Sequence, residues 1–190
     1  MEYILLFIGA IFVNNIVFSQ FLGICPFLGV SKKLDTALGM GAAVTFVVTI
    51  ATLVTFAIQK LVLDKYGIQY MQNIAFILVI ASVVQMLEIV LKKISPSLYS
   101  ALGVFLPLIT TNCMVLGVAI SVIQSDFNLA QSIVYAIASA IGYTFAIGIF
   151  AVSREQLAKT SVPGSLAGIP ISLITAGILA MAFMGFTGLV

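Results

Sequence analysis

The sequence predicts an all-α membrane protein with six transmembrane helices, arranged as two inverted repeats of three helices each. The composition, the spacing of the charged residues, and a short motif that recurs at half the chain length support this prediction. Of the 190 residues, 62% are hydrophobic and only 7% are charged, whereas soluble proteins usually contain about 25% charged residues. A soluble domain of this size could not cover its core with so few polar side chains.

The charged residues divide the chain into six uncharged runs, each of at least 22 residues. A helix needs about 20 apolar residues to cross a bilayer, so each run is long enough for one crossing. Together the six helices fill the chain, and we expect a single integral membrane domain over residues 1–190, with repeats of about 1–93 and about 94–190. The expected helices are Tyr3–Gly23, Ala37–Ile58, Tyr70–Leu91, Ala101–Val122, Leu129–Val152 and Ile169–Leu189.

Lysine and arginine residues are distributed unevenly among the expected connections. Only Lys60 and Lys65 lie in the second connection, and the other six lie in the first, third and fifth: Lys32, Lys33, Lys92, Lys93, Arg154 and Lys159. Because cytoplasmic loops carry the excess of positive residues, we expect both termini on the non-cytoplasmic side. The net charge of +2 comes from these few loop residues, so no nucleic-acid partner is expected. The N-terminus shows neither a basic region nor a small-residue cleavage site, so we expect no removable signal peptide.

The motif C-x-x-L-G occurs twice, at 25–29 and at 113–117, and contains the only two cysteines of the chain. Cys25 and Cys113 are 88 positions apart, and each lies in the first uncharged run of its half. Three crossings per half mean that the second half enters the membrane from the opposite side, so any duplication is inverted. The sequence therefore predicts that two copies of one element face each other.

The two cysteine-bearing runs, 3–31 and 94–125, are longer than a straight transmembrane helix requires. Both contain helix-weakening proline or glycine together with polar side chains that can satisfy the freed backbone groups. We therefore expect the first and fourth helices to be discontinuous, with each break exposing a cysteine. The alternative is a pair of ordinary kinked helices with packing glycines. The residues concerned are Asn14, Asn15, Gly23, Pro26, Gly29, Pro107, Asn112 and Gly117.

Either cysteine alone would be interpreted as a small buried hydrophobe. Their matching positions suggest instead that both bind one metal centre. Most [2Fe–2S] clusters take four cysteine ligands, and this chain has two cysteines and no histidine, so a second polypeptide would have to supply the other two. A structural zinc site needs as many ligands but has no evident purpose within a bilayer. Supporting residues would be Gly23, Pro26, Gly29, Asn112 and Gly117, with backbone N–H groups near the glycines hydrogen-bonding cluster sulfurs.

Asn14, Asn15 and Glu88 are candidates for an ion path because polar residues are costly within a membrane. Asn14, Asn15 and also Asn112 have a structural alternative, which is to cap half-helices or to hydrogen-bond between helices. Glu88 has one as well, because Lys92 lies four residues later and completes a common helical ion pair. Two small-xxx-small pairs, Ala37/Gly41 and Ala138/Gly142, indicate close helix packing.

The segments 14–17, 21–33, 110–113 and 162–164 resemble the A-type subunit of the Rnf complexes, and the resemblance extends over the whole chain. The homologous E subunit of the sodium-pumping NADH:quinone oxidoreductases is also similar. The resemblance implies a six-helix subunit, in a bacterial or archaeal cell membrane, of a complex that couples electron transfer between ferredoxin and NAD to Na⁺ or H⁺ transport. It further implies one intramembrane [2Fe–2S] cluster, to which Cys25 and Cys113 contribute two ligands and a homologous E-type subunit of opposite orientation contributes the other two.

No phosphate-binding loop, dinucleotide fingerprint or nucleophile–base pair is present in the sequence, so this chain alone holds no complete active site. Flavins and further clusters would lie on other subunits of the complex. The competing functional hypothesis is a small secondary transporter or channel whose solute site lies at the broken helices. A third is a structural membrane anchor with inert cysteines.

Overall fold

The computed structural model describes residues 2–31, 33–66, 69–94, 108–109, 111–160, 163 and 167–186. These residues form helices and connecting segments, with no strand among them, in agreement with the predicted all-α class. The longer helices are α3 (Leu34–Ile58), α5 (Gln72–Ile94), α8 (Cys113–Gln124), α9 (Leu129–Leu157) and α10 (Ile169–Met184). The shorter elements are α1 (Glu2–Ile8), η1 (Gly9–Val13), α2 (Ile24–Val30), η2 (Gln59–Leu63), α4 (Asp64–Tyr66) and η3 (Gln69–Met71).

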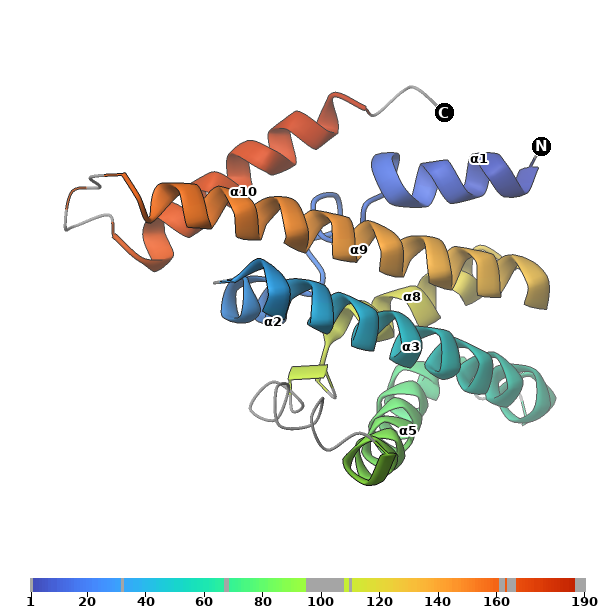
Figure 1. Ribbon diagram of the computed structural model, residues 1–190. Helices are drawn as coiled ribbons and strands as arrows, with labels where there is room; N and C mark the ends of the chain where they lie inside the picture. The colour runs from blue at the N-terminus through green and yellow to red at the C-terminus, as the bar shows by residue number, and fades with distance from the viewer. Residues whose placement is uncertain are drawn as a thin grey trace.

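Helices α3 and α9 run side by side in opposite directions through the centre of the molecule (Figure 1). The two predicted small-xxx-small pairs belong to this core: Ala37 and Gly41 on α3 and Ala138 and Gly142 on α9 are all buried. A side chain at Gly41 would collide with Thr144 of α9, so glycine is what allows the two helices to approach so closely. The start of α9 is fixed by a capping box between Asn128 and Gln131.

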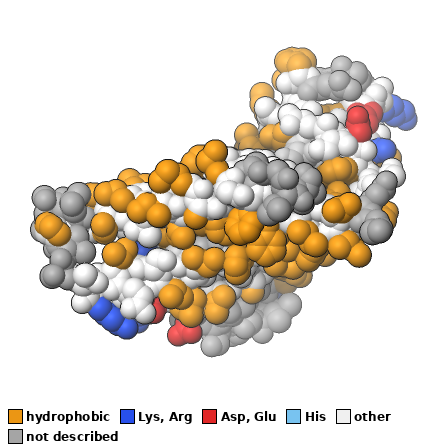
Figure 2. All heavy atoms as spheres, turned by 90° about the horizontal axis from the view of Figure 1, so that it is seen from above, with side chains coloured by type: hydrophobic (Ala, Val, Ile, Leu, Met, Phe, Trp, Pro, Cys, Tyr) orange, Lys and Arg blue, Asp and Glu red, His pale blue; other side chains and the backbone are white. Residues whose placement is uncertain are grey.

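Among the described residues, three helical segments are long and apolar enough to cross a membrane: Leu34–Leu61, Gln72–Val90 and Leu129–Leu157. They coincide with the second, third and fifth expected spans. Large apolar side chains remain exposed on the outer faces, for example Leu173, Ile178 and Met181 on α10. Figure 2 shows one such face, on which hydrophobic side chains predominate and charged ones lie mostly toward the ends. This distribution suits helices whose outer surface meets lipid rather than water.

The first expected span, Tyr3–Gly23, is interrupted. The helical segment Tyr3–Val13 is followed by a non-helical stretch from Asn14 to Gly23, and the chain becomes helical again in α2. We expected Pro26 and Gly29 to help break this helix, and that expectation was wrong because both lie within α2. Proline is tolerated in the first turn of a helix, where the backbone N–H has no intrahelical acceptor.

The fourth expected span, Ala101–Val122, begins in residues outside the described part of the chain, and so does Pro107. The part that the structure describes is α8, which starts at Cys113 directly after its N-cap Asn112. The sixth span appears as α10, with Pro170 in its first turn. These two helices and the segment Tyr3–Val13 are apolar but shorter than a full membrane crossing.

Replacing Gly41 by alanine tests the central packing. The new Cβ atom would lie 2.9 Å from the Thr144 Cβ atom, so we expect the free energy of unfolding to fall by about 1–3 kcal/mol. Gly39, on the same helix, has no atom within 4 Å of the corresponding position, and Gly39→Ala should be neutral or slightly stabilising. Thermal unfolding in detergent measures both. Equal melting temperatures for the two variants would show that α3 and α9 do not pack as described.

Candidate functional site

The structure brings the two cysteine motifs together. The backbone N–H of Gly23 donates a hydrogen bond to Sγ of Cys113, with 2.9 Å between the nitrogen and the sulfur. Cys25 follows Gly23 by two residues, so their Cα atoms are at most about 7 Å apart. Both cysteines are free thiols; Cys25 is exposed and Cys113 is partly buried. Two residues 88 positions apart in the sequence thus meet at one place in the fold.

Each cysteine lies at the start of a helix. Cys25 is the second residue of α2, and Cys113 is the first residue of α8. The first N–H groups of a helix have no intrahelical acceptor and carry a partial positive charge, so they favour a thiolate or another anion. The Asn112 side chain accepts a hydrogen bond from the Met114 N–H at 3.0 Å and so caps α8, as one interpretation of the sequence anticipated.

Asn15 gives the non-helical stretch before α2 its shape. Its buried side chain donates to the carbonyl of Ile11 at 2.9 Å and to the carbonyl of Gly142 at 3.0 Å. Its Oδ1 atom accepts from the Val17 N–H at 3.1 Å. A single side chain therefore satisfies groups on both sides of the break and joins the break to α9. Such internal pairing is what permits irregular backbone within a membrane.

Two glycines of the predicted site allow the motifs to approach each other. Gly23 adopts a left-handed conformation with φ of 80°, and a Cβ atom there would lie 3.0 Å from Cε2 of Tyr143. At Gly117 a Cβ atom would collide with the Leu22 side chain. At Gly29 the nearest atom would be Cδ1 of Leu108 at 3.8 Å, an ordinary contact. Gly23 is therefore required by its backbone conformation and close contact, a side chain at Gly117 would force only the end of the Leu22 side chain to move, and Gly29 has ordinary space.

Two buried polar atoms at the site, the Tyr143 hydroxyl and the Asn112 Nδ2 atom, have no hydrogen-bond partner among the described residues. The Tyr143 ring lies against Gly23, where a Cβ atom would be 3.0 Å from its Cε2 atom. Leaving buried donors unpaired costs about 1–3 kcal/mol each, so these two donors favour an acceptor that the described residues do not provide. The sequence did not identify Tyr143, because nothing distinguishes it from other tyrosines in apolar helices.

Helix α9 also holds the cysteine-bearing helix α2 in place. The rings of Phe27 and Phe150 stack with 4.1 Å between their centroids. The Arg154 Nη1 atom donates to the Leu28 carbonyl at 2.8 Å and to the Ser31 hydroxyl at 2.9 Å, which places a cation at the C-terminal end of α2. In the sequence Arg154 resembles an ordinary loop charge, and nothing near it along the chain indicates this contact.

Within the described residues, no group of three or more His, Cys, Asp or Glu side chains could hold a metal ion. A four-thiolate site would therefore need two more ligands besides Cys25 and Cys113. The donor set nevertheless fits an anionic cluster: two thiols, two helix N-termini and unpaired buried donors lie together, and the exposure of Cys25 leaves the site open to another chain.

The other predicted residues lie in varied environments. Pro26 is buried in α2, Asn14 is exposed, and Glu88 is partly exposed on α5. Among the described residues, neither Asn14 nor Glu88 takes part in the hydrogen bonds around Cys113. Their role in an ion path stays a prediction, as does the pairing of Glu88 with Lys92.

Comparison with known proteins finds one matching family and relatives that align over nearly the whole chain. A family described as "Rnf-Nqr subunit, membrane protein" matches residues 3–190. The chain is 55% identical, over 100% of its length and 98% of the relative, to the A-type subunit of the Na⁺-translocating ferredoxin:NAD⁺ oxidoreductase complex of Acetobacterium woodii. It is 57% identical to the A-type subunit of the ion-translocating oxidoreductase complex of Syntrophotalea carbinolica, over 98% of this chain and 97% of that one. The corresponding protein of Yersinia enterocolitica is 53% identical, over 100% and 98%.

Gly23→Ala tests the requirement for glycine beside Cys113. The substitution places a side chain at positive φ and against the Tyr143 ring, and we expect it to cost about 1–3 kcal/mol of stability. Gly29→Ala is the matched control in the same motif and should change stability by less than about 1 kcal/mol. The melting temperatures of the two purified variants provide the comparison. If Gly23→Ala melted no lower than Gly29→Ala, the close approach described here would be refuted.

Proposed function

Since this chain belongs to the Rnf-Nqr family of membrane subunits, we propose that it is an electron-relay subunit of an Rnf-type ion-translocating oxidoreductase complex. The relatives named above are A-type subunits of such complexes, and this chain matches them over nearly its whole length. The relative from Acetobacterium woodii carries ferredoxin and NAD⁺ in its name, so we propose the same electron donor and acceptor for the complex that contains this chain.

The hydrogen bond between the Gly23 N–H and Cys113 Sγ is the observation that carries the proposal. It joins the two halves of the chain at Cys113 and two residues before Cys25, and apolar packing encloses the junction: Ile16, Phe27 and Met114 are all buried. We propose that Cys25 and Cys113 hold one half of a [2Fe–2S] cluster. When bound, such a cluster supplies a one-electron carrier within the membrane.

The residues around the two thiols would orient and stabilise an anionic cluster. Helix N-termini at Cys25 and Cys113 favour negative charge. The unpaired donors of Tyr143 and Asn112 are available to hydrogen-bond an acceptor near the sulfurs, and such contacts raise a cluster's reduction potential. The Phe27–Phe150 stack and Arg154 fix the position of α2. The chain thus supplies ligands, charge stabilisation and an apolar enclosure.

A partner chain is needed because the described residues provide only two thiols. A homologous E-type subunit of opposite orientation would supply the other two cysteines at the exposed side of Cys25. The antiparallel arrangement of α3 and α9, each with a small-xxx-small pair (Figure 1), supports an inverted repeat within this chain. Flavins and further clusters, which exchange electrons with soluble donors and acceptors, would belong to other subunits.

The contacts of the polar residues weigh against the competing hypothesis of a solute transporter. In that hypothesis Asn14, Asn15 and Thr110–Asn112 would coordinate a solute. Asn14 is exposed, and Thr110 lies outside the described residues. For Asn15, both the amide nitrogen and the amide oxygen are hydrogen-bonded to backbone, and Oδ1 of Asn112 caps α8. Their oxygen atoms already have protein partners, which favours the relay over the transporter.

Replacing either cysteine by serine tests the ligand assignment. We expect Cys25→Ser and Cys113→Ser each to remove two iron atoms per complex and the associated EPR signal, because serine is a poor ligand for such clusters. Gly29→Ala is the control variant and should keep both. The measurement is iron and sulfide analysis with EPR on the purified complex. Unchanged iron content in both serine variants would refute the assignment.

The charge distribution predicts the orientation in the membrane. With both termini outside the cytoplasm, alkaline phosphatase fused after the last residue, Val190, should be active, because that enzyme folds only outside the reducing cytoplasm. A fusion after Lys159 should be inactive. Comparing the two activities, corrected for expression, decides between the orientations. The opposite pattern would overturn the orientation without affecting the cysteine assignment.

A further inference from the structure

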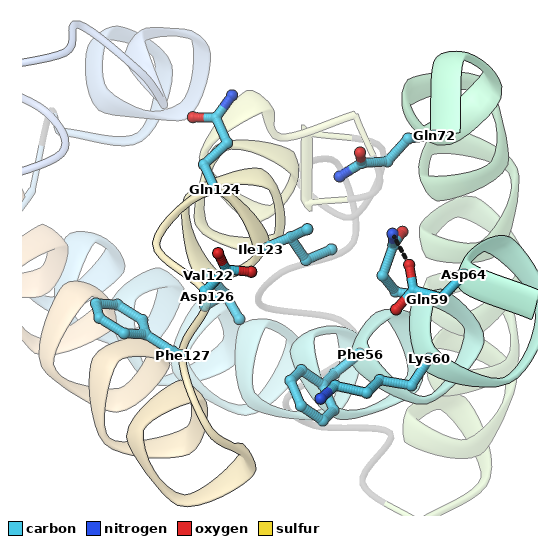
Figure 3. Close-up of a pocket in the computed structure, with 10 residues that line it drawn as sticks. All are labelled: Phe56, Gln59, Lys60, Asp64, Gln72, Val122, Ile123, Gln124, Asp126 and Phe127. Atoms are coloured by element: carbon cyan, nitrogen blue, oxygen red, sulfur yellow. Dashed lines mark hydrogen bonds between the residues drawn. The ribbon is translucent and has the colours of Figure 1, made fainter. Parts of the chain in front are cut away.

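A second polar site lies at the far end of α8 from Cys113. A cavity of about 310 Å³ opens between the C-terminal end of α8, the η2 segment and the start of α5 (Figure 3). Figure 3 shows Gln59, Asp64 and Gln72 on one side of the opening and the 122–127 segment on the other. No residue of the cysteine site lines this cavity.

Gln59 is the informative residue. It is only 6% exposed, and its Nε2 atom donates to Oδ1 of Asp64 at 2.9 Å. A carboxylate accepts hydrogen bonds and cannot donate them, so the amide orientation is fixed by this contact. The Oε1 atom of Gln59 is buried and has no partner among the described residues. A buried acceptor without a donor is unfavourable. Because Gln59 lines the cavity, its unpaired Oε1 atom favours a ligand there that supplies positive charge or a hydrogen-bond donor.

The charges around the cavity favour a cation. Asp64 and Asp126 contribute two carboxylates, against one ammonium group, that of Lys60. The Lys60 ammonium lies 5.4 Å from the centre of the Phe56 ring, which provides it with a partner of its own. The carbonyl groups of Ser121, Val122 and Ile123 at the C-terminal end of α8 already accept hydrogen bonds from backbone N–H groups, so the two carboxylates supply the negative charge. The described side chains that line the cavity therefore carry a net charge of about −1.

Oxygen ligands select hard cations. The available atoms here are carboxylate and amide oxygens, and one net negative charge is balanced by a monovalent ion. We propose that this cavity is a binding site for a monovalent alkali cation of the Na⁺ type. This inference rests on the proposed function: an ion-translocating complex must take up or release its cation at a membrane surface, and that need would explain a cation site here.

Helix α8 connects this site with the proposed electron relay. Cys113 is its first residue and Gln124 its last, so about 18 Å of helix separates the thiol from the cavity. A rigid helix of this length transmits a displacement of one end to the other. The geometry thus places a cation site and a cluster ligand on one structural element.

The test measures equilibrium binding of radioactive sodium to the purified complex, at constant ionic strength maintained with choline chloride. Asp126→Asn and Gln59→Met should each weaken binding at one site at least about tenfold, because each removes a charge or an oxygen ligand. Asp35→Asn is the control: Asp35 is exposed in the first turn of α3 and does not line the cavity, so binding should equal that of the wild type.

Iron content and the EPR signal are measured on the same samples, so that this proposal and the proposed function can fail separately. Weaker sodium binding with normal iron in both cavity variants supports the site. Wild-type sodium binding in Asp126→Asn and Gln59→Met overturns it, whatever the iron content shows. If a variant loses iron or melts lower in choline alone, Gln59→Glu, which keeps an oxygen ligand and adds charge, must retain or strengthen sodium binding; weaker binding there also overturns the site.

Discussion

The rest of the structure depends on one constraint: within lipid, every backbone N–H and carbonyl group must find a partner inside the protein. The chain leaves the helical conformation between Asn14 and Gly23, where it gives up the pairing that a helix provides automatically. Asn15 restores part of it through the Ile11 and Gly142 carbonyls, and the Gly23 N–H is paired with a sulfur instead of an oxygen. The break and the cysteine site are therefore one feature.

Helix α9 is the scaffold that makes this break possible. Within a single stretch, the Gly142 carbonyl accepts from Asn15, Tyr143 packs against Gly23, Phe150 stacks on Phe27, and Arg154 binds the end of α2. Tyr143, Phe150 and Arg154 follow one another at seven and four positions and so share one face of the helix, and Gly142 lies next to Tyr143. Close packing of α9 on α3 through Gly41 fixes that face. Rigid helices thus position the irregular segment that carries Cys25.

The two ends of α8 have different chemistry for a simple reason. At its N-terminus unpaired N–H groups and the Asn112 cap surround a thiol, which suits an anionic group. Beyond its C-terminus, Asp126 lines the cavity together with Asp64, and two carboxylates suit a cation. A membrane protein that handles both electrons and ions needs both environments, separated by apolar packing.

The sequence by itself determined the all-α class and the positions of the three long helices. These follow from composition and from uncharged run lengths, which depend only on the thickness of the bilayer. It also predicted an interrupted first helix, but put Pro26 and Gly29 in the interruption, because a proline near a helix start and one inside a helix look alike in sequence. Only the tertiary structure decided that the break precedes Cys25. The structure was also needed to find the contacts of Tyr143 and Arg154 and the unpaired Oε1 atom of Gln59. The partner of a side chain is set by contacts between distant segments and not by its neighbours along the chain.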